Sequence, residues 1–140
     1  FIDTSFVIAM FTPEDRYHQK ALEISSDLFS VSTNMITDAV LYKIGNSFSK
    51  SKKGPVAEFI RDCYKTEQIH VEKTSKELLI KALERYDKFA DKEWSLTDCL
   101  SFEVMAENDI VLAYSSDHHF EQAGFHTLCD KPGEIMKIQY

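Results

Sequence analysis

Two kinds of segment follow one another along the 140 residues, and this order constrains the fold most strongly. Short segments that are apolar, or that alternate apolar and polar residues, are separated by longer segments with helical periodicity. The short segments suit buried strands, and we expect strands at 28–33, 68–72, 109–116 and 125–129. Helical segments separate these strands, so each connection crosses the sheet and joins parallel strands with a right-handed turn. The sequence therefore predicts an α/β fold, a three-layer sandwich with a central mainly parallel sheet, built as a single domain over residues 1–140.

Capping signals and apolar periodicity place the helices. Thr12, which precedes a proline, is typical of a helix start, and Thr74 with Glu77 and Ser95 with Asp98 have the spacing of capping boxes. We expect helices at 12–29, 37–50, 55–66, 74–89 and 95–105. The residues predicted to face the core are Val40, Leu41, Ile44 and Phe48, then Val56, Phe59, Ile60 and Cys63, and then Leu78, Leu79, Ala82, Leu83, Tyr86 and Phe89.

The composition argues against several classes of protein. The chain has 44% apolar and 28% charged residues, and no apolar run approaches the ~20 residues that span a bilayer. We expect a cytoplasmic protein without a membrane partner. Cys63, Cys99 and Cys129 stand far apart, which argues against disulfides and a zinc knuckle. The net charge of -7 disfavours binding of nucleic acid through a basic patch, but is compatible with a nuclease that holds its substrate through a metal.

The opening stretch, "FIDTSFVIAMF", combines apolar side chains with one carboxylate, Asp3. We expect a buried strand here, with Asp3 at or just past its end. A charge taken out of water costs several kcal/mol or more unless a partner or a metal compensates it. Asp3 is therefore either a cap or a functional group.

Two further carboxylates are expected at the same edge of the sheet. Asp117 follows the apolar strand 109–116, and Asp98 lies in the first turn of the helix that leads into that strand. Taken singly, Asp98 can complete its capping box, Asp117 can be a turn residue and Asp3 can be a cap. Ligands of parallel α/β sheets bind beyond the carboxyl ends of the strands, and carboxylates gathered there suit Mg²⁺ or Mn²⁺. Together the three acids favour a metal site.

Four segments in succession resemble the motifs of PIN-domain proteins of the VapC toxin type. The segments are "FIDTSFVIAMF", "AVLYKIGNSFSK", "DKEWSLTDCLSFEVM" and "SSDHHFEQAGFHTL", and the match covers nearly the whole chain in the family's order. The resemblance implies a PIN-like fold and a divalent-metal-dependent ribonuclease that hydrolyses RNA phosphodiester bonds. It also implies two protein partners, a cognate antitoxin and a second copy of the chain in a homodimer.

The resemblance also implies roles for individual residues. Asp3, Asp98 and Asp117 would be the catalytic, metal-binding carboxylates, with Asp3 and Asp98 on the principal ion. Asp117 would bind that ion through water or help to hold a second one. The cation would lower the pKa of a bound water and offset charge on the phosphoryl oxygens. The supporting polar positions are Thr4, Ser5, Asn46 and Ser115.

One position departs from the family pattern, because Lys43 stands where a glutamate normally precedes Ile-Gly-Asn. We expect the lysine to point inward, where its ammonium group can pair with aspartates and compete with the cation. The alternative is a snorkelling lysine outside the site. Asp38 and Glu103 lie about 140° around their helices from Lys43 and Asp98, so neither is expected to replace the missing ligand.

Two functions from different classes therefore stay open. The first is an active metal-dependent ribonuclease, and the second is a catalytically weak or inactive PIN-fold module that sequesters an antitoxin. The expected antitoxin site is a groove between the helices that carry Val40 and Val56. A remoter alternative is an aspartyl-phosphate enzyme with Asp3 as nucleophile, although "DTS" lacks the second acid expected two residues on.

The remaining histidine and tryptophan side chains have structural interpretations. His118 and His119 follow Asp117 and raise a zinc hypothesis, but Zn²⁺ needs three or four preorganised ligands and no further histidine lies near in sequence. We expect one of these rings to face solvent and the other to pack. Trp94 is predicted to lie in the core rather than to stack on bases.

Overall fold

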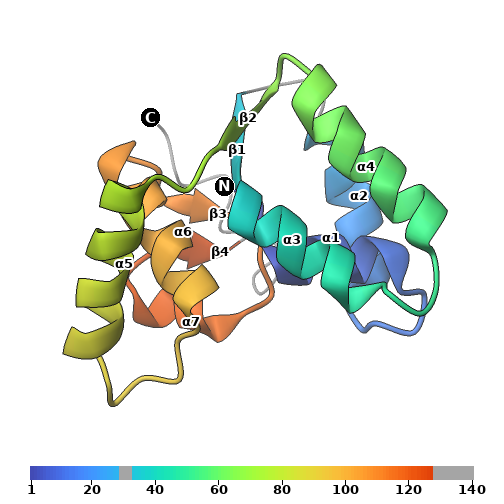
Figure 1. Ribbon diagram of the computed structural model, residues 1–140. Coiled ribbons are helices and arrows are strands. Elements are labelled where there is room, and N and C mark those ends of the chain that lie inside the picture. The colour runs from blue at the N-terminus through green and yellow to red at the C-terminus, as the bar shows by residue number, and fades with distance from the viewer. Residues whose placement is uncertain (29–32, 128–140) are drawn as a thin grey trace.

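The structure, a computed structural model, describes residues 1–28 and 33–127 (Figure 1). Within these ranges no helix has the length and apolar character needed to cross a bilayer. The elements in chain order are α1 (Thr4–Phe11), α2 (His18–Leu28), β1 (Asn34–Thr37), α3 (Asp38–Ser47), α4 (Lys53–Lys65), β2 (Ile69–Glu72), α5 (Lys76–Lys88), α6 (Leu96–Glu107), β3 (Leu112–Ala113), α7 (His118–Gln122) and β4 (His126–Thr127).

The strands form two parallel pairs that the first residues of the chain join. β1 pairs with β2 and β3 pairs with β4. Between the pairs, the Ile2 N–H donates to the Met35 carbonyl at 2.8 Å, and the Asp3 N–H donates to the Tyr114 carbonyl at 3.1 Å. The resulting order is β2, β1, the segment 1–3, β3 and β4. From segment 1–3 the chain therefore passes to β1 on one side, and later to β3 on the other side. Parallel α/β sheets bind their ligands at such a point, where the strand order reverses.

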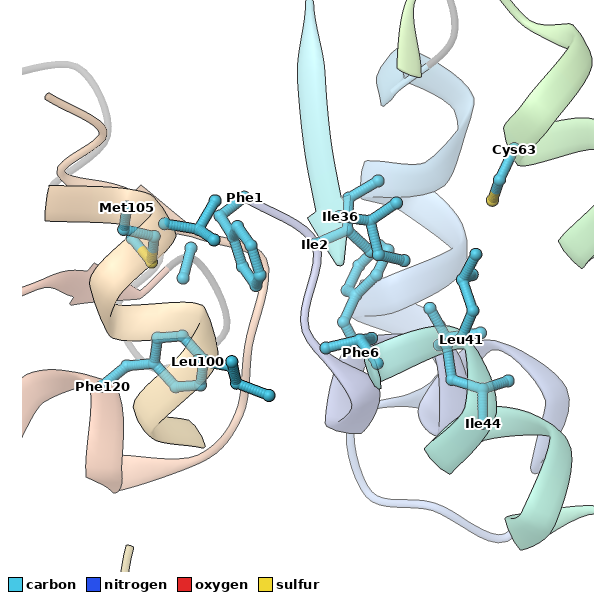
Figure 2. Close-up of a cluster of buried hydrophobic side chains, with 14 of the residues drawn as sticks. Phe1, Ile2, Phe6, Ile36, Leu41, Ile44, Cys63, Leu100, Met105 and Phe120 are labelled. Carbon is cyan, nitrogen blue, oxygen red and sulfur yellow. The ribbon is translucent and has the colours of Figure 1, made fainter. Parts of the chain in front are cut away.

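Helices lie on both sides of these strands, with α1 to α4 on one side and α5 to α7 on the other (Figure 1). Successive residues of an extended segment point to opposite faces. Figure 2 shows Phe1 directed toward α6 and Phe120, and Ile2 directed toward Phe6 and Ile36. Both faces of the sheet are thus buried, which confirms the predicted mixed α/β sandwich with parallel strands.

The prediction of a strand over the opening stretch is wrong. Only the residues up to Asp3 are extended, and Thr4–Phe11 form α1, with Asp3 as its N-cap. The buried residues of α1 include Thr4, Phe6, Val7 and Ala9, so the helix has little polar face to reveal it. A short, uniformly apolar segment cannot be assigned to helix or strand by periodicity alone.

The second helix also begins later than predicted. Turns occupy residues 13–17, where the Asp15 carboxylate accepts the Tyr17 N–H at 2.8 Å, and α2 starts at His18 rather than after Thr12. The helix ends at Leu28. Most of the strand predicted at 28–33 lies at 29–32, outside the described residues, and the observed strand is β1.

The fifth helix starts one residue later than its predicted cap. Ser75 is the N-cap and its hydroxyl accepts the Leu78 N–H at 3.0 Å, whereas Thr74 is bonded to α3. Leu78 and Ala82 are buried as expected. The prediction is wrong for Leu83 and Tyr86, which are 42% and 47% exposed.

The predicted strands near the C-terminus are longer than those observed. β3 contains only Leu112 and Ala113, and Val111 is 52% exposed. β4 begins at His126 instead of position 125. The end of that predicted strand lies outside the described residues, as does Cys129.

Other sequence predictions are confirmed. α3, α4, β2 and α6 occupy the predicted regions, and α6 opens with the Ser95–Asp98 capping box. Cys63 and Cys99 are buried and free. Trp94 is buried, and its indole N–H donates to Gln122 at 3.1 Å.

Candidate functional site

Asp3 is enclosed at the start of α1, where it is only 4% exposed. Its Oδ2 accepts the Ser5 N–H at 3.1 Å, the Ser5 hydroxyl at 2.7 Å and the Ser115 hydroxyl at 2.9 Å. Burial raises the pKa of the Asp3 carboxyl, and the hydrogen bonds from the two serines offset only part of that effect. The side chain is therefore firmly positioned, but its ionised form is costly unless a cation lies nearby.

Hydrogen bonds of Ser115 link the end of segment 1–3 to the segment that follows β3. Ser115 is fully buried directly after Tyr114, and the oxygen that donates to Asp3 also accepts the Asp117 N–H at 3.0 Å. The Ser5 hydroxyl lies 3.1 Å from the Ser115 hydroxyl and accepts the Ser116 N–H at 3.0 Å. Both serines named by the family resemblance thus contact Asp3, and Ser115 also orders the backbone at Asp117.

Asp98 enters the site from the first turn of α6. Its N–H donates to the Ser95 hydroxyl at 3.1 Å, while its Oδ2 accepts the Ser95 N–H at 2.8 Å. The residue is 4% exposed. Capping is not its only contact, because the same Oδ2 lies 3.4 Å from Nδ1 of His119.

His119 lies between two of the predicted acids. Its Nδ1 is 3.3 Å from Oδ1 of Asp117 and 3.4 Å from Oδ2 of Asp98, and its side chain is 15% exposed. Asp117 is the N-cap of α7, and its Oδ1 also accepts the His119 N–H at 2.9 Å. A continuous line of contacts therefore runs from Asp3 through Ser115, Asp117 and His119 to Asp98.

This position of His119 is the functional feature that the sequence analysis missed. One ring of the pair was expected to pack and the other to face solvent, and the structure confirms this, since the His118 side chain is 68% exposed. The approach of His119 to Asp98 depends on how α6 packs beside α7. Sequence spacing carries no signal for that contact.

The other supporting positions behave differently from the serines. Thr4 is buried, and its hydroxyl has no hydrogen-bond partner among the described residues. Asn46 is exposed on α3, and none of the hydrogen bonds in the described ranges joins its side chain to an acid. The structure therefore brings Ser5 and Ser115 to the acids, leaves the Thr4 hydroxyl unsatisfied beside Asp3 in sequence, and does not bring Asn46 to them.

Lys43 is exposed on α3. In the part of the chain that the structure describes, its ammonium group makes no ion pair with an aspartate. Asp38 accepts the Thr74 N–H at 3.1 Å, and Glu103 pairs with Arg85 at 2.6 Å. These two acids are engaged elsewhere, as predicted.

The donor set fits a hard divalent cation. Asp3, Asp98 and Asp117 offer carboxylate oxygens along one line of contacts, and oxygen ligands suit Mg²⁺ or Mn²⁺. Two buried polar atoms, the Thr4 hydroxyl oxygen and Nδ1 of His119, have no hydrogen-bond partner among the described residues. The combination of a carboxyl with a raised pKa and unsatisfied polar atoms is typical of a site completed by a ligand.

Comparisons with known proteins identify the family and the fold. The family model for the PIN domain matches residues 1–126. Among solved structures, the chain is similar to Mycobacterium tuberculosis VapC20, described as a sarcin-ricin loop cleaving toxin, with a TM-score of 0.80 and 25% sequence identity. That match covers 90% of this chain and 95% of the VapC20 chain. A search among curated proteins found no match.

Proposed function

Because the chain belongs to the PIN-domain family, we propose that it is a divalent-metal-dependent ribonuclease of the VapC type that hydrolyses RNA phosphodiester bonds. The observation that carries the proposal is the line of contacts that joins Asp3 to Asp117 through Ser115 and Asp117 to Asp98 through His119. Three acidic residues from distant parts of the sequence are linked by polar contacts that are buried or partly buried. Each of these acids also caps a helix, but capping does not require the Ser115 and His119 contacts that link the acids to one another.

In this proposal each residue of the site has a distinct task. Asp3 and Asp98 hold the principal Mg²⁺ or Mn²⁺, and Asp117 binds it through water or helps to hold a second ion. When bound, the cation supplies Lewis-acid activation of water and offsets charge on the phosphoryl oxygens. Ser5 and Ser115 are positioning residues, since their hydroxyls fix Oδ2 of Asp3.

The exposure of Lys43 bears on whether the chain is active. An ammonium group that paired with the aspartates would compete with the cation, but no such pair is present among the described residues. This observation favours the active ribonuclease over the inactive module that sequesters an antitoxin. Loss of the glutamate oxygen still removes one ligand, so we propose that Lys43 lowers metal affinity without abolishing cleavage.

Cleavage of RNA by the purified chain tests the proposal. We expect cleavage with Mn²⁺ and none with a chelator, and Asp98→Asn should lower the rate roughly 100-fold or more. Asp109→Asn is the matched control, because Asp109 lies exposed before β3 with a φ of 54°, a conformation that asparagine accepts. Equal rates for the two variants would exclude Asp98 from the reaction. Because VapC20 is described as cleaving the sarcin-ricin loop, an RNA of that structure is the first substrate to assay.

A second comparison tests the role of Lys43. Lys43→Glu should cleave faster than the unchanged chain at limiting Mn²⁺, and the difference should shrink as Mn²⁺ is raised. If the chain already cleaves as well as the variant at every Mn²⁺ concentration, Lys43 does not impair it. No cleavage by either protein would favour the inactive binding module.

The protein partners proposed are a cognate antitoxin and a second copy of the chain. The two helices expected to form the antitoxin groove pack against each other at Gly45, where Ile60 Cδ1 lies 3.8 Å from the place that a Cβ would take. On the same helices Tyr42 and Tyr64 are 69% and 63% exposed. A pull-down with an antitoxin candidate, using Tyr42→Ala and Tyr64→Ala, tests docking here, and a mass measurement in solution tests the dimer.

A further inference from the structure

Asp117, His118 and His119 form a cluster that the ribonuclease proposal does not fully use. Each residue offers one ligand atom, and these atoms all lie within 4.8 Å of one another. Sequence spacing argued against zinc because Zn²⁺ needs three or four preorganised ligands and no further histidine lies near in sequence. The structure shows that Asp117, His118 and His119 are already close together, and it brings the Asp98 carboxylate within 3.4 Å of Nδ1 of His119.

Two distances within the cluster are close to those around a tetrahedral ion. Oδ1 of Asp117 lies 3.3 Å from Nδ1 of His119 and 3.7 Å from Nδ1 of His118. Zn²⁺ binds nitrogen and oxygen at about 2.0–2.1 Å, so neighbouring ligand atoms of a tetrahedral site are about 3.4 Å apart. The contact of Asp117 with His119 already has this spacing, whereas the exposed His118 ring must move closer to Asp117 to accept such an ion.

A second observation points to a ligand at this position. Nδ1 of His119 is buried and, within the described ranges, has no hydrogen-bond partner although two carboxylate oxygens lie within 3.4 Å. Buried polar atoms without partners are rare and costly. A bound metal would give this nitrogen a coordinate bond in place of two contacts that are not hydrogen bonds.

We propose that Asp117, His118 and His119 form a second metal site, for a borderline transition-metal ion such as Zn²⁺, which shares Asp117 with the magnesium or manganese site. Two imidazole nitrogens with one carboxylate favour Zn²⁺, whereas Mg²⁺ prefers oxygen ligands. The His118 side chain is 68% exposed, so the site is open to solvent and its ion can exchange.

Sharing of Asp117 has a consequence for activity. An ion held by Asp117 and the two histidines withdraws that carboxylate from the oxygen-ligated site, so Zn²⁺ should inhibit cleavage supported by Mn²⁺. This consequence rests on the proposed ribonuclease function, whereas the binding of Zn²⁺ does not.

Metal titration of the whole chain tests the site directly. We expect Zn²⁺ to bind with one-to-one stoichiometry in calorimetry, and Co²⁺ to produce the visible absorption of a tetrahedral complex. His118→Ala should weaken Zn²⁺ binding at least about tenfold. Since the His118 side chain is exposed, this variant should fold normally, which circular dichroism checks.

Two further variants keep the test decisive. His119→Ala should also weaken Zn²⁺ binding and abolish the Co²⁺ absorption. His126→Ala is the matched control, because His126 is an exposed histidine that does not belong to the cluster, and it should bind Zn²⁺ as the unchanged chain does. Equal Zn²⁺ affinities for His118→Ala and His126→Ala, or the absence of tetrahedral Co²⁺ absorption, would overturn the proposal.

An activity measurement separates this inference from the proposed function. Zn²⁺ added to a cleavage reaction with Mn²⁺ should inhibit the unchanged chain at lower concentrations than it inhibits His118→Ala. Zn²⁺ binding that depends on His118, in a chain that never cleaves RNA, would support the second site and contradict the ribonuclease. Cleavage with Mn²⁺ by a chain whose Zn²⁺ affinity does not change in His118→Ala would support the ribonuclease and contradict the second site.

Discussion

The line of contacts from Asp3 to Asp98 differs at its two ends in how its side chains are hydrogen-bonded. At the Asp3 end, formed by Asp3, Ser5 and Ser115, one carboxylate oxygen accepts three hydrogen bonds of 2.7 to 3.1 Å. At the His119 end, formed by Asp98, Asp117 and His119, Nδ1 of the imidazole approaches two carboxylates without a hydrogen bond to either. The Asp3 end is therefore preorganised by the chain itself, whereas the His119 end is completed by whatever binds there.

The largest expected effect comes from Asp3→Asn. The amide oxygen can still accept the hydrogen bonds from Ser5 and Ser115, but the negative charge is lost. We expect Mn²⁺-dependent cleavage to fall roughly 100-fold or more. We also expect the metal-free variant to melt higher than the unchanged chain, because a buried charge has been removed. Thermal unfolding with and without Mn²⁺ checks this, and only the unchanged chain should gain stability from the metal at this end.

The pKa of Asp3 gives the same substitution a pH signature. Burial raises the folded-state pKa above its ordinary value of 3.8, so the folded chain binds more protons than the unfolded chain between these two values. This contribution to stability is present below 3.8 and is lost as pH rises through the raised pKa. Asp3→Asn should flatten that part of the curve of metal-free stability against pH. An unchanged curve would show that the Asp3 carboxyl is not strained by burial.

Ser115→Ala should act on stability more than any other serine substitution in the site. It removes the buried donor to Asp3 and leaves the partly buried Asp117 N–H without its acceptor, which should cost about 1–3 kcal/mol in urea unfolding. Ser101→Ala is the control, because Ser101 is equally buried but donates only to the Thr97 carbonyl in its own helix. That change should cost less than about 1 kcal/mol. Equal losses would mean that burial, and not the link between strand ends, determines the effect.

The contrast between the two ends also explains what sequence could predict. Asp3, Asp98 and Asp117 were predicted at one edge because strand ends of a parallel sheet converge, and that rule depends only on the order of elements. The capping box of Ser95 and Asp98 was predicted correctly because its contacts are local in sequence. The contact of His119 with Asp98 is set by the packing of α6 beside α7, which no local pattern encodes.

The failure at the opening stretch has a related cause. Residues 4–11 are apolar on nearly every side because α1 is buried, so the periodicity that separates helix from strand is absent. The prediction that Asp3 ends an extended segment was nevertheless correct, because Ile2 and Asp3 bond to neighbouring strands. The alignment of "KIGN" led us to expect that Lys43 can pair with aspartates, and no such ion pair is present among the described residues.

Thr4→Val should have a smaller effect on stability, and it tests whether Thr4 belongs to the Asp3 end. The Thr4 hydroxyl is buried without a partner among the described residues, so its removal should change the free energy of unfolding by less than about 1 kcal/mol and can be stabilising. If the hydroxyl serves the cation or the substrate, cleavage should nonetheless fall. A loss of stability as large as that of Ser115→Ala would show that Thr4 belongs to the preorganised Asp3 end.

The smallest expected effect uses Cys99 as a reporter of the His119 end. Burial raises the pKa of the Cys99 thiol to about 11, and the neighbouring charge of Asp98 adds to this, whereas burial and Asp62 raise the pKa of Cys63 to about 12. Neither thiol should be alkylated at neutral pH in the folded chain. Asp98→Asn should speed alkylation of Cys99 at alkaline pH by less than about tenfold, because one unit of pKa is a tenfold change in thiolate. A divalent cation bound at Asp98 should have the same effect. Equal acceleration at Cys63, measured by mass spectrometry of peptides, would instead indicate general opening of the fold and refute the electrostatic explanation.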